Sequence, residues 1–222
     1  MSDEKNCSKP MEMSPRKADD VIVCFDFDGT LTFRDSFVSF LFYGAGWCRF
    51  TLGGLVLLPY AIGFKLGFIS SHRAKEVTLS HFFAGQSRQK LQLLAEAFAN
   101  DVVPGLLRPK GLERIEWHRS QEHHLVLVSA SLDLWLEPVA RKLGMKLICT
   151  RLRYVDGEFS GEIDGTNCYG PEKERKILER YPGIDYAYGD TRGDHEMMNM
   201  AQTAFFKPFR KASLEEERWR SR

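Results

Sequence analysis

The amino-acid sequence predicts an α/β protein, in which a parallel sheet is flanked by helices and interrupted by an α-helical insertion. Two continuous apolar runs, VIVCF at 21–25 and LVLV at 125–128, are typical of strands that are covered on both faces. Helical patterns separate the later strand candidates, and this alternation is typical of parallel βαβ units. No convincing strand occurs between the two runs, so the helical segments there predict the insertion.

The other expected strands are shorter and lie in the second half of the chain. In the stretch RYVDGEFSGEI, Asp156 and Gly157 separate two alternating runs, which predicts a small β-hairpin on the sheet. Further strands are predicted at 146–149, 186–188 and 203–206, and helices at 134–143, 172–181 and 196–202.

The insertion sets the expected domain division. Within it we expect helices at 36–43, 52–64, 74–83, 88–99 and 111–118. The chain then divides into a disordered leader (1–20), an α/β core (21–32 and 124–210), a helical cap (33–123) and a C-terminal tail (211–222).

Composition narrows the class of protein. The 222 residues carry a net charge of +1 with acids and bases mixed, whereas a nucleic-acid-binding protein shows a basic patch or stripe. The five cysteines are scattered and form no CxxC pair, so we expect reduced thiols in the cytoplasm and no zinc site. The first twenty residues lack the apolar stretch of a secretory signal. The oligomeric state stays open.

The stretch from Leu52 to Phe64 is apolar and allows two interpretations. Only 15 uncharged residues separate Arg49 from Lys65, a spanning helix needs about 20, and Pro59 lies in the middle, so we do not expect a transmembrane helix. We expect a buried helix pair within the insertion. The alternative is an apolar surface that contacts the inner membrane peripherally or binds a lipid-like substrate.

Two aspartates follow the first predicted strand at once. Asp26 and Asp28 are placed at its carboxyl end, where open α/β sheets bind their ligands. Two neighbouring carboxylates repel each other, and a divalent cation removes that conflict. Mg²⁺ fits best, because it takes oxygen ligands and is typically held by one or two carboxylates together with a substrate phosphate.

A second acidic pair follows a later strand. Asp190 and Asp194 lie in the loop GDTRGD, where Gly189 and Gly193 permit a tight turn into a helix. Four aspartates at strand ends concentrate negative charge, which again predicts a cation.

Other polar residues can balance the negative charge of a phosphate group. Ser129 ends the second strand, and its hydroxyl can donate to phosphoryl oxygens, as can Ser131 beyond it. Lys173 begins a helix after a Gly-Pro turn and can supply a fixed positive charge. Each residue also has a structural interpretation, as a helix cap, a turn residue or a solvated charge, and for Lys176 we prefer the last.

In this order, the residues resemble the motifs of the haloacid dehalogenase-like phosphatases. The helical insertion is similar to the C1 cap of the phosphoserine phosphatase-like branch (subfamily IB), which includes bacterial phosphatidylglycerophosphate phosphatases. The resemblance extends from Val21 to Phe206 and implies a Rossmann-like sheet. It rests on DFDGTLT (Asp26–Thr32) for the first motif, Ser129 for the second, Lys173 for the third, and Asp190 with Asp194 for the fourth.

The resemblance implies a mechanism. Asp26 would attack phosphorus and become an aspartyl-phosphate, while Asp28 would act as general acid and then general base. Mg²⁺ would be held by Asp26, the backbone carbonyl of Asp28, and Asp190. The remaining implied roles are phosphate binding for Ser129 and Lys173, loop support or phosphate binding for Thr30, and orientation of metal waters or Lys173 for Asp194.

Several functions stay open for such a site. The substrate is a phosphorylated small molecule or a lipid headgroup, and a phosphatidylglycerophosphate phosphatase is one alternative. A phosphoserine phosphatase is another, although Asp35 replaces a usual glutamate and Gly193 a frequent asparagine. A receiver domain that holds an aspartyl-phosphate without turnover is a remote third. Specificity lies in the cap, where Arg34, Asp35, His72 and Arg73 are the polar candidates.

Overall fold

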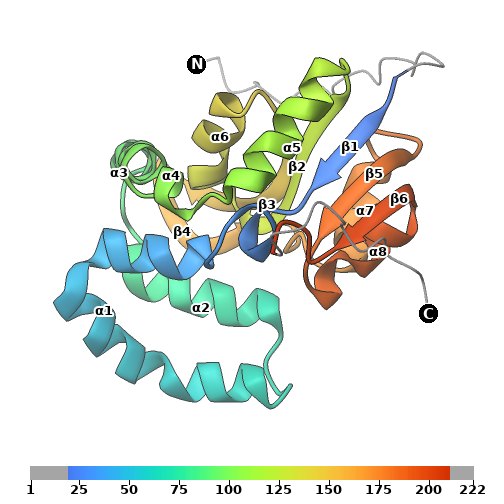
Figure 1. Ribbon diagram of the computed structural model, residues 1–222. Helices are drawn as coiled ribbons and strands as arrows, with labels where there is room; N and C mark the ends of the chain where they lie inside the picture. Colours follow the sequence, from blue (N-terminus) through green and yellow to red (C-terminus); the bar gives the residue numbers. More distant parts are fainter. Residues whose placement is uncertain (1–19, 211–222) are drawn as a thin grey trace, which may run out of the picture.

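A computed structural model describes residues 20–210 and shows a six-stranded sheet with helices on both faces (Figure 1). The strand order is β4-β3-β2-β1-β5-β6, and every neighbouring pair is parallel except β3 and β4. The predicted α/β fold with one antiparallel hairpin is therefore confirmed. The strands are β1 (Ile22–Phe25), β2 (His124–Leu132), β3 (Lys146–Val155), β4 (Glu158–Asp164), β5 (Ile184–Gly189) and β6 (Ala201–Phe206).

Helices cover the sheet in two layers. Alternate residues of β1 point to opposite faces: Val23 and Phe25 join one buried cluster, and Ile22 and Cys24 join another. Helices α5 and α6 contribute to the first cluster, and α7 and α8 to the second. The helices are α1 (Ser36–Lys65), α2 (Ser71–Phe83), α3 (Arg88–Asp101), α4 (Val103–Leu106), α5 (Pro109–Ser120), α6 (Asp133–Lys142), α7 (Pro171–Leu178) and α8 (His195–Asn199).

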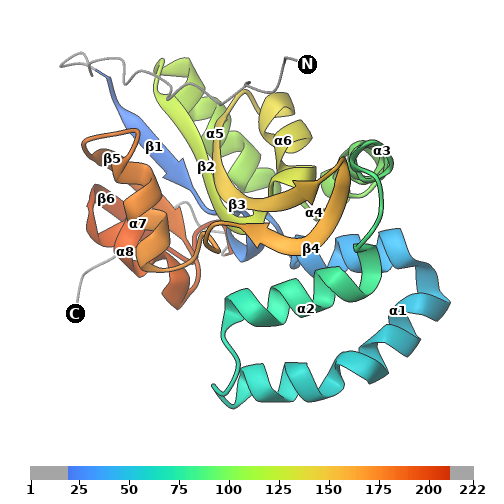
Figure 2. The ribbon, with the colours of Figure 1, turned by 180° about the vertical axis from the view of Figure 1, so that it is seen from behind.

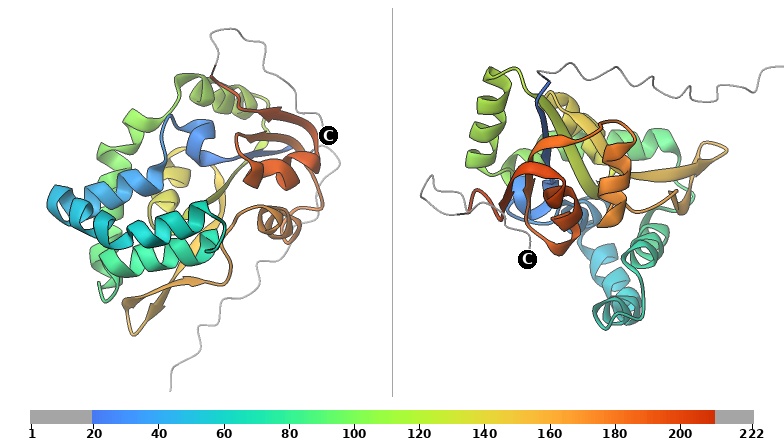
Figure 3. Two further views of the ribbon diagram at one scale, coloured as in Figure 1. Left: turned by 90° about the horizontal axis from the view of Figure 1, so that it is seen from below. Right: turned by 90° about the vertical axis from the view of Figure 1, so that its right-hand side faces the viewer.

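The insertion has two parts that are placed differently. Helices α1 and α2 form a pair that projects beyond the end of β1, whereas α3 and α5 return to the sheet layer (Figures 2 and 3). The two helices expected at 36–43 and 52–64 both lie within α1, which is interrupted between them at Gly46, where the backbone is not helical (φ 71°, ψ 166°). The division of the chain into a core and a cap at 33–123 stays a prediction.

The prediction that 52–64 is buried is wrong. Within this stretch only Gly53 and Leu57 are buried, while Leu55 is 69% exposed. The reason is that this half of α1 contacts its partner α2 along a narrow stripe, where Gly53 lies against the ring of Phe82. By length and composition α1 could also cross a membrane, a criterion that many core helices of soluble proteins meet.

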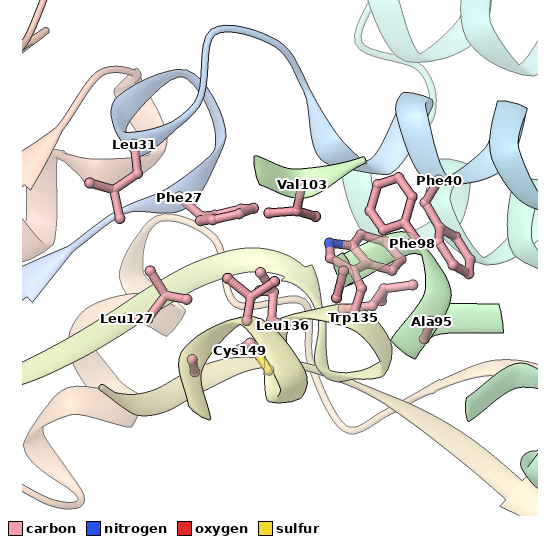
Figure 4. Close-up of a cluster of buried hydrophobic side chains, with 14 of the residues drawn as sticks. Phe27, Leu31, Phe40, Ala95, Phe98, Val103, Leu127, Trp135, Leu136 and Cys149 are labelled. Atoms are coloured by element: carbon pink, nitrogen blue, oxygen red, sulfur yellow. The ribbon is translucent and has the colours of Figure 1, made fainter. Parts of the chain in front are cut away.

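A cluster of aromatic side chains joins the base of α1 to the rest of the molecule (Figure 4). The rings of Phe40 and Trp135 stack at 4.6 Å between centroids, and Phe98 packs edge-on against Phe40 at 5.3 Å. The Trp135 indole also donates a hydrogen bond to Ser36 Oγ (3.1 Å) at the start of α1. These contacts fix the beginning of the projecting helix pair relative to the sheet.

The remaining differences from expectation concern element ends. The strand predicted at 146–149 continues to Val155, because the hairpin extends it. The helix predicted at 196–202 ends at Asn199, since β6 begins at Ala201 and pairs with β5. The expected leader and tail lie outside the described residues, apart from residue 20.

We expect Phe98→Ala to lower the free energy of unfolding by about 3–5 kcal/mol, because it empties a fully buried position between two aromatic rings. Leu93→Ala, on the exposed side of the same helix, should change it by less than about 0.5 kcal/mol. Urea unfolding followed by circular dichroism measures both. Equal effects would contradict the role given to this cluster.

Candidate active site

Predicted site residues from separate segments meet at the carboxyl edge of the sheet. Asp26 follows β1 directly and Ser129 lies near the end of β2, while Lys173 comes from the first turn of α7. Asp190 follows β5, and Asp194 closes the short turn after it. Parallel strands place all these segments at one edge, which is why residues far apart in the sequence share one site.

A buried ammonium group lies at the centre of this site. Lys173 Nζ donates to Asp26 Oδ1 (2.6 Å), to Asp194 Oδ1 (2.6 Å) and to the carbonyl of Val128 (3.0 Å). All three ammonium hydrogens are therefore used, and the three charged side chains are almost fully buried. Lys173 thus joins α7 to the ends of β1, β2 and β5.

The charges of this cluster shift each other's pKa. Burial and the neighbouring Asp194 raise the pKa of Asp26 well above its usual value, although Lys173 opposes them. For Asp194, burial acts upward, but Lys173 and two backbone amides bring the pKa below its usual value. The cluster holds more carboxylates than cations, which is the condition that favours a bound metal ion.

The acids fit a divalent cation. Carboxylate oxygens of Asp26, Asp190 and Asp194 lie within 4.8 Å of one another. Asp190 Oδ1 is buried and accepts no hydrogen bond, and its other oxygen accepts one from Arg210 (2.7 Å). Glycine at position 29 allows the backbone after Asp28 to lie close to the Asp190 carboxylate. Its φ is +79°, and a Cβ there would lie 2.3 Å from Asp190 Oδ2.

Asp194 connects Lys173 to the backbone of the loop that carries Asp190. Its Oδ2 accepts hydrogen bonds from the backbone amides of Asp190 (3.0 Å) and Thr191 (2.9 Å), and its Oδ1 accepts from Lys173. Both oxygens are thus engaged, so the geometry favours the predicted positioning role. Glycine at 193 also has a steric reason, because a Cβ there would lie 2.2 Å from the ring of Tyr169.

Asp28 is held separately from the lysine. Its Oδ2 accepts a hydrogen bond from Ser131 Oγ (2.5 Å), and its Oδ1 accepts one from the backbone amide of Ser36 (2.6 Å), the first residue of α1. Burial, followed by the charge of Asp35, raises the pKa of Asp28 to about 6. A carboxyl group with such a pKa can both donate and accept a proton near neutral pH.

Thr30 and Ser129 have different surroundings. Thr30 is fully buried and its hydroxyl donates to Asp26 Oδ2 (3.0 Å), which favours support of Asp26 over phosphate contact. Ser129 Oγ accepts a hydrogen bond from the amide of Ser131 (3.0 Å) and faces the cavity beside Asp26 and Asp28.

A cavity of about 510 Å³ lies between these polar residues and the projecting helix pair. Asp35 lines it, whereas Arg34, His72 and Arg73 do not. The α1 side of the cavity is apolar and is formed by Phe37, Val38, Leu57, Tyr60, Ala61 and Phe64.

Sequence reasoning missed Lys75, which faces this cavity from α2. Its ammonium group donates to the carbonyl of Ala130 (2.5 Å) and to Asn167 Oδ1 (2.9 Å), and burial lowers its pKa to about 8. No motif surrounds Lys75, so only its position in an amphipathic helix could have indicated that it points inward.

We expect Lys173→Met to lower the free energy of unfolding in EDTA by about 3–5 kcal/mol, because it leaves two buried carboxylates without their cation. Adding Asp194→Asn should restore part of that loss. Lys176→Met on the same helix should have a much smaller effect, since Lys176 bonds only backbone carbonyls. Equal losses for the two lysine variants in chemical denaturation would contradict the central role of Lys173.

Comparison with known proteins agrees with this geometry. A family model for haloacid dehalogenase-like hydrolases matches residues 23–199. Protein CicA of Caulobacter vibrioides is 38% identical over 195 residues, which cover 86% of this chain and 87% of CicA. A probable phosphatase of Mycobacterium tuberculosis is 30% identical over 127 residues, 54% of this chain and 44% of that protein.

Among solved structures, a phospho-aspartyl intermediate analogue of phosphoserine phosphatase has the same fold. It superposes with a TM-score of 0.56 at 19% identity, over 83% of this chain and 85% of the other. The family match covers the strands and turns that carry every predicted site residue. The chain therefore belongs to the haloacid dehalogenase-like hydrolase family.

Proposed function

We propose that the protein is a Mg²⁺-dependent phosphomonoester phosphatase that acts through an aspartyl-phosphate on Asp26. The observation that carries this proposal is that Asp26 and the Lys173 ammonium meet beside one cavity, with Asp190 close to Asp26 and Asp28 held apart from the lysine. The likeness in fold to phosphoserine phosphatase supports membership of the phosphoserine phosphatase-like branch, and the mycobacterial relative supports phosphatase chemistry.

The residues present fit a magnesium ion. The unpartnered, buried oxygen of Asp190 and the excess of carboxylates over cations are the features that support it. Asp26, Asp190 and the backbone carbonyl of Asp28 would hold the ion. When bound, the ion would neutralise negative charge on the phosphoryl oxygens and on Asp26.

The protein's own side chains account for the proton and bond changes. A carboxylate oxygen of Asp26 attacks phosphorus, the bond from phosphorus to the ester oxygen breaks, and protonated Asp28 gives its proton to that oxygen. Asp28 then takes a proton from water, whose oxygen attacks the same phosphorus and releases inorganic phosphate from Asp26. Ser131 and the start of α1 keep Asp28 in position through both steps.

Positive charge and hydroxyl groups position the reacting carboxylate. Lys173 and Thr30 each bond one oxygen of Asp26, so the side chain is preorganised before substrate binds. Ser129 faces the cavity, which supports the proposal that its hydroxyl bonds phosphoryl oxygens of the substrate. We assign the cap function to α1 and α2, which cover this side of the cavity and would exclude water during the reaction.

The cavity favours one substrate class over another. Its α1 wall is apolar. Of the two charged residues in the lining outside the proposed catalytic group, Lys75 already bonds Ala130 and Asn167, and Asp35 caps α1, so few partners remain for the amino and carboxylate groups of free phosphoserine. A phosphorylated lipid headgroup, as in phosphatidylglycerophosphate, fits better, because its acyl chains could follow that wall.

The cytoplasm suits this function, and the described cysteines, Cys24, Cys48, Cys149 and Cys168, are all free thiols.

We expect Asp26→Asn to reduce Mg²⁺-dependent hydrolysis of p-nitrophenyl phosphate to background, because an amide cannot act as the nucleophile. Asp28→Asn should lower kcat by about 10²–10⁴-fold, the usual contribution of a general acid–base group. Asp156→Asn in the exposed hairpin is the matched control. Normal turnover by the Asp26 variant would disprove the mechanism, and a stable phosphoprotein without turnover would favour the receiver alternative.

We further expect phosphatidylglycerophosphate in mixed micelles to be hydrolysed with a kcat/KM well above that of phosphoserine. Malachite green detection of released phosphate measures both. Leu57→Asp places a charge in the apolar wall and should affect the lipid more strongly than p-nitrophenyl phosphate. A clear preference for phosphoserine would exclude the lipid assignment while leaving the phosphatase proposal intact.

A further inference from the structure

Helix α1 and the loop after it expose an unusual amount of apolar side chain. The exposure is highest at Trp47 (70%) and Phe68 (84%). Of the 19 large hydrophobic residues that are exposed in the described part of the chain, 12 belong to this one segment, so the exposure is concentrated. All of them except Val38, which lies near the start of the helix, form what we call the α1 apolar surface: Phe42, Trp47, Leu52, Leu55, Val56, Leu58, Tyr60, Ile62, Phe64, Leu66 and Phe68.

The distribution of these residues indicates what covers them. Leu55, Val56 and Leu58 are consecutive or nearly so, and they point in different directions around the helix. A second copy of the chain, or a groove on a partner, would cover one side of the helix and leave the others in water. A helix that is apolar all round is typical of a lipid environment.

The charges nearby suit an anionic lipid surface. No acidic residue occurs from Ser36 to Lys65, while Arg49 and Lys65 stand at the two ends of the apolar half of α1. Basic residues that flank an apolar helix are attracted to anionic headgroups. Gly53 and Leu57 are held by the rest of the protein, so the helix stays attached along one line while its other sides are free to enter the lipid.

We propose that the α1 apolar surface docks the protein onto an anionic phospholipid bilayer. The same helix contributes Leu57, Tyr60 and Phe64 to the wall of the cavity that contains Asp26. Docking would therefore bring the bilayer to the mouth of the proposed active site. This last consequence rests on the proposed function, whereas the docking itself depends only on exposure and charge.

Flotation with vesicles tests the docking without using activity. The full-length protein is mixed with vesicles of phosphatidylglycerol and phosphatidylcholine, or of phosphatidylcholine alone, and the bound fraction is measured after centrifugation. We expect binding to the anionic vesicles that weakens as salt is raised. Leu55→Asp combined with Ile62→Asp should lower the partition coefficient by about tenfold or more, since two apolar side chains leave the lipid.

Leu93→Asp is the matched control, because Leu93 is 68% exposed but lies on α3. Its vesicle binding should equal that of the unchanged protein. Circular dichroism shows whether each variant is folded and does not depend on the proposed function. Hydrolysis of p-nitrophenyl phosphate without vesicles tests the proposed function separately, so the docking and the activity can each be contradicted alone. Brominated lipids should quench the fluorescence of Trp47, and this quenching should be lost in Trp47→Phe. The measurement is a second readout that needs no charged variant.

Three results would overturn the proposal. One is the absence of vesicle binding together with unquenched Trp47 fluorescence. Another is a concentration-dependent dimer in sedimentation velocity that Leu55→Asp with Ile62→Asp abolishes, because the surface would then be an interface between two copies. Equal binding of the Leu93→Asp and double variants would assign the membrane contact to another surface, which also contradicts the proposal.

Discussion

The ion pairs of Lys173 with Asp26 and Asp194 are the interaction on which the site depends. One ammonium group, buried among oxygens, draws together the ends of β1, β2 and β5 and the first turn of α7. A buried charge is stable only when it is fully paired, so this arrangement fixes the positions of both carboxylates. Because Asp194 also binds the backbone of the Asp190 loop, the placement of Asp190 follows from the same lysine.

Helix α1 contacts the candidate active site and also forms part of the exposed surface of the protein. Its first residue, Ser36, donates a backbone hydrogen bond to Asp28, and its middle forms the apolar wall of the cavity. Its outer positions form the exposed surface. A movement of this helix would therefore change the general acid, the substrate cavity and the docking surface together. The aromatic cluster of Phe40, Phe98 and Trp135 restrains that movement at the base of the helix.

Sequence patterns predicted the sheet and the acids for definite physical reasons. Strands buried on both faces must be continuously apolar, and acids at the ends of such strands must meet. For this reason β1, β2, Asp26 and Asp190 could be predicted from the sequence. The surroundings of 52–64 could not be predicted, because composition does not distinguish a buried helix from an apolar helix without a partner. Lys75 was missed since its partners, Ala130 and Asn167, approach only in the folded chain. The interruption at Gly46 likewise depends on a backbone conformation that many glycines never adopt.

Chemical trapping of the phosphorylated residue tests the central claim most directly. Protein mixed with Mg²⁺ and substrate is quenched in acid and reduced with borohydride, which converts an aspartyl-phosphate into homoserine, and the site is located by peptide mass spectrometry. The account predicts homoserine at position 26 and at no other aspartate. Active protein that yields homoserine elsewhere, or none under conditions that trap other acyl phosphates, would contradict it.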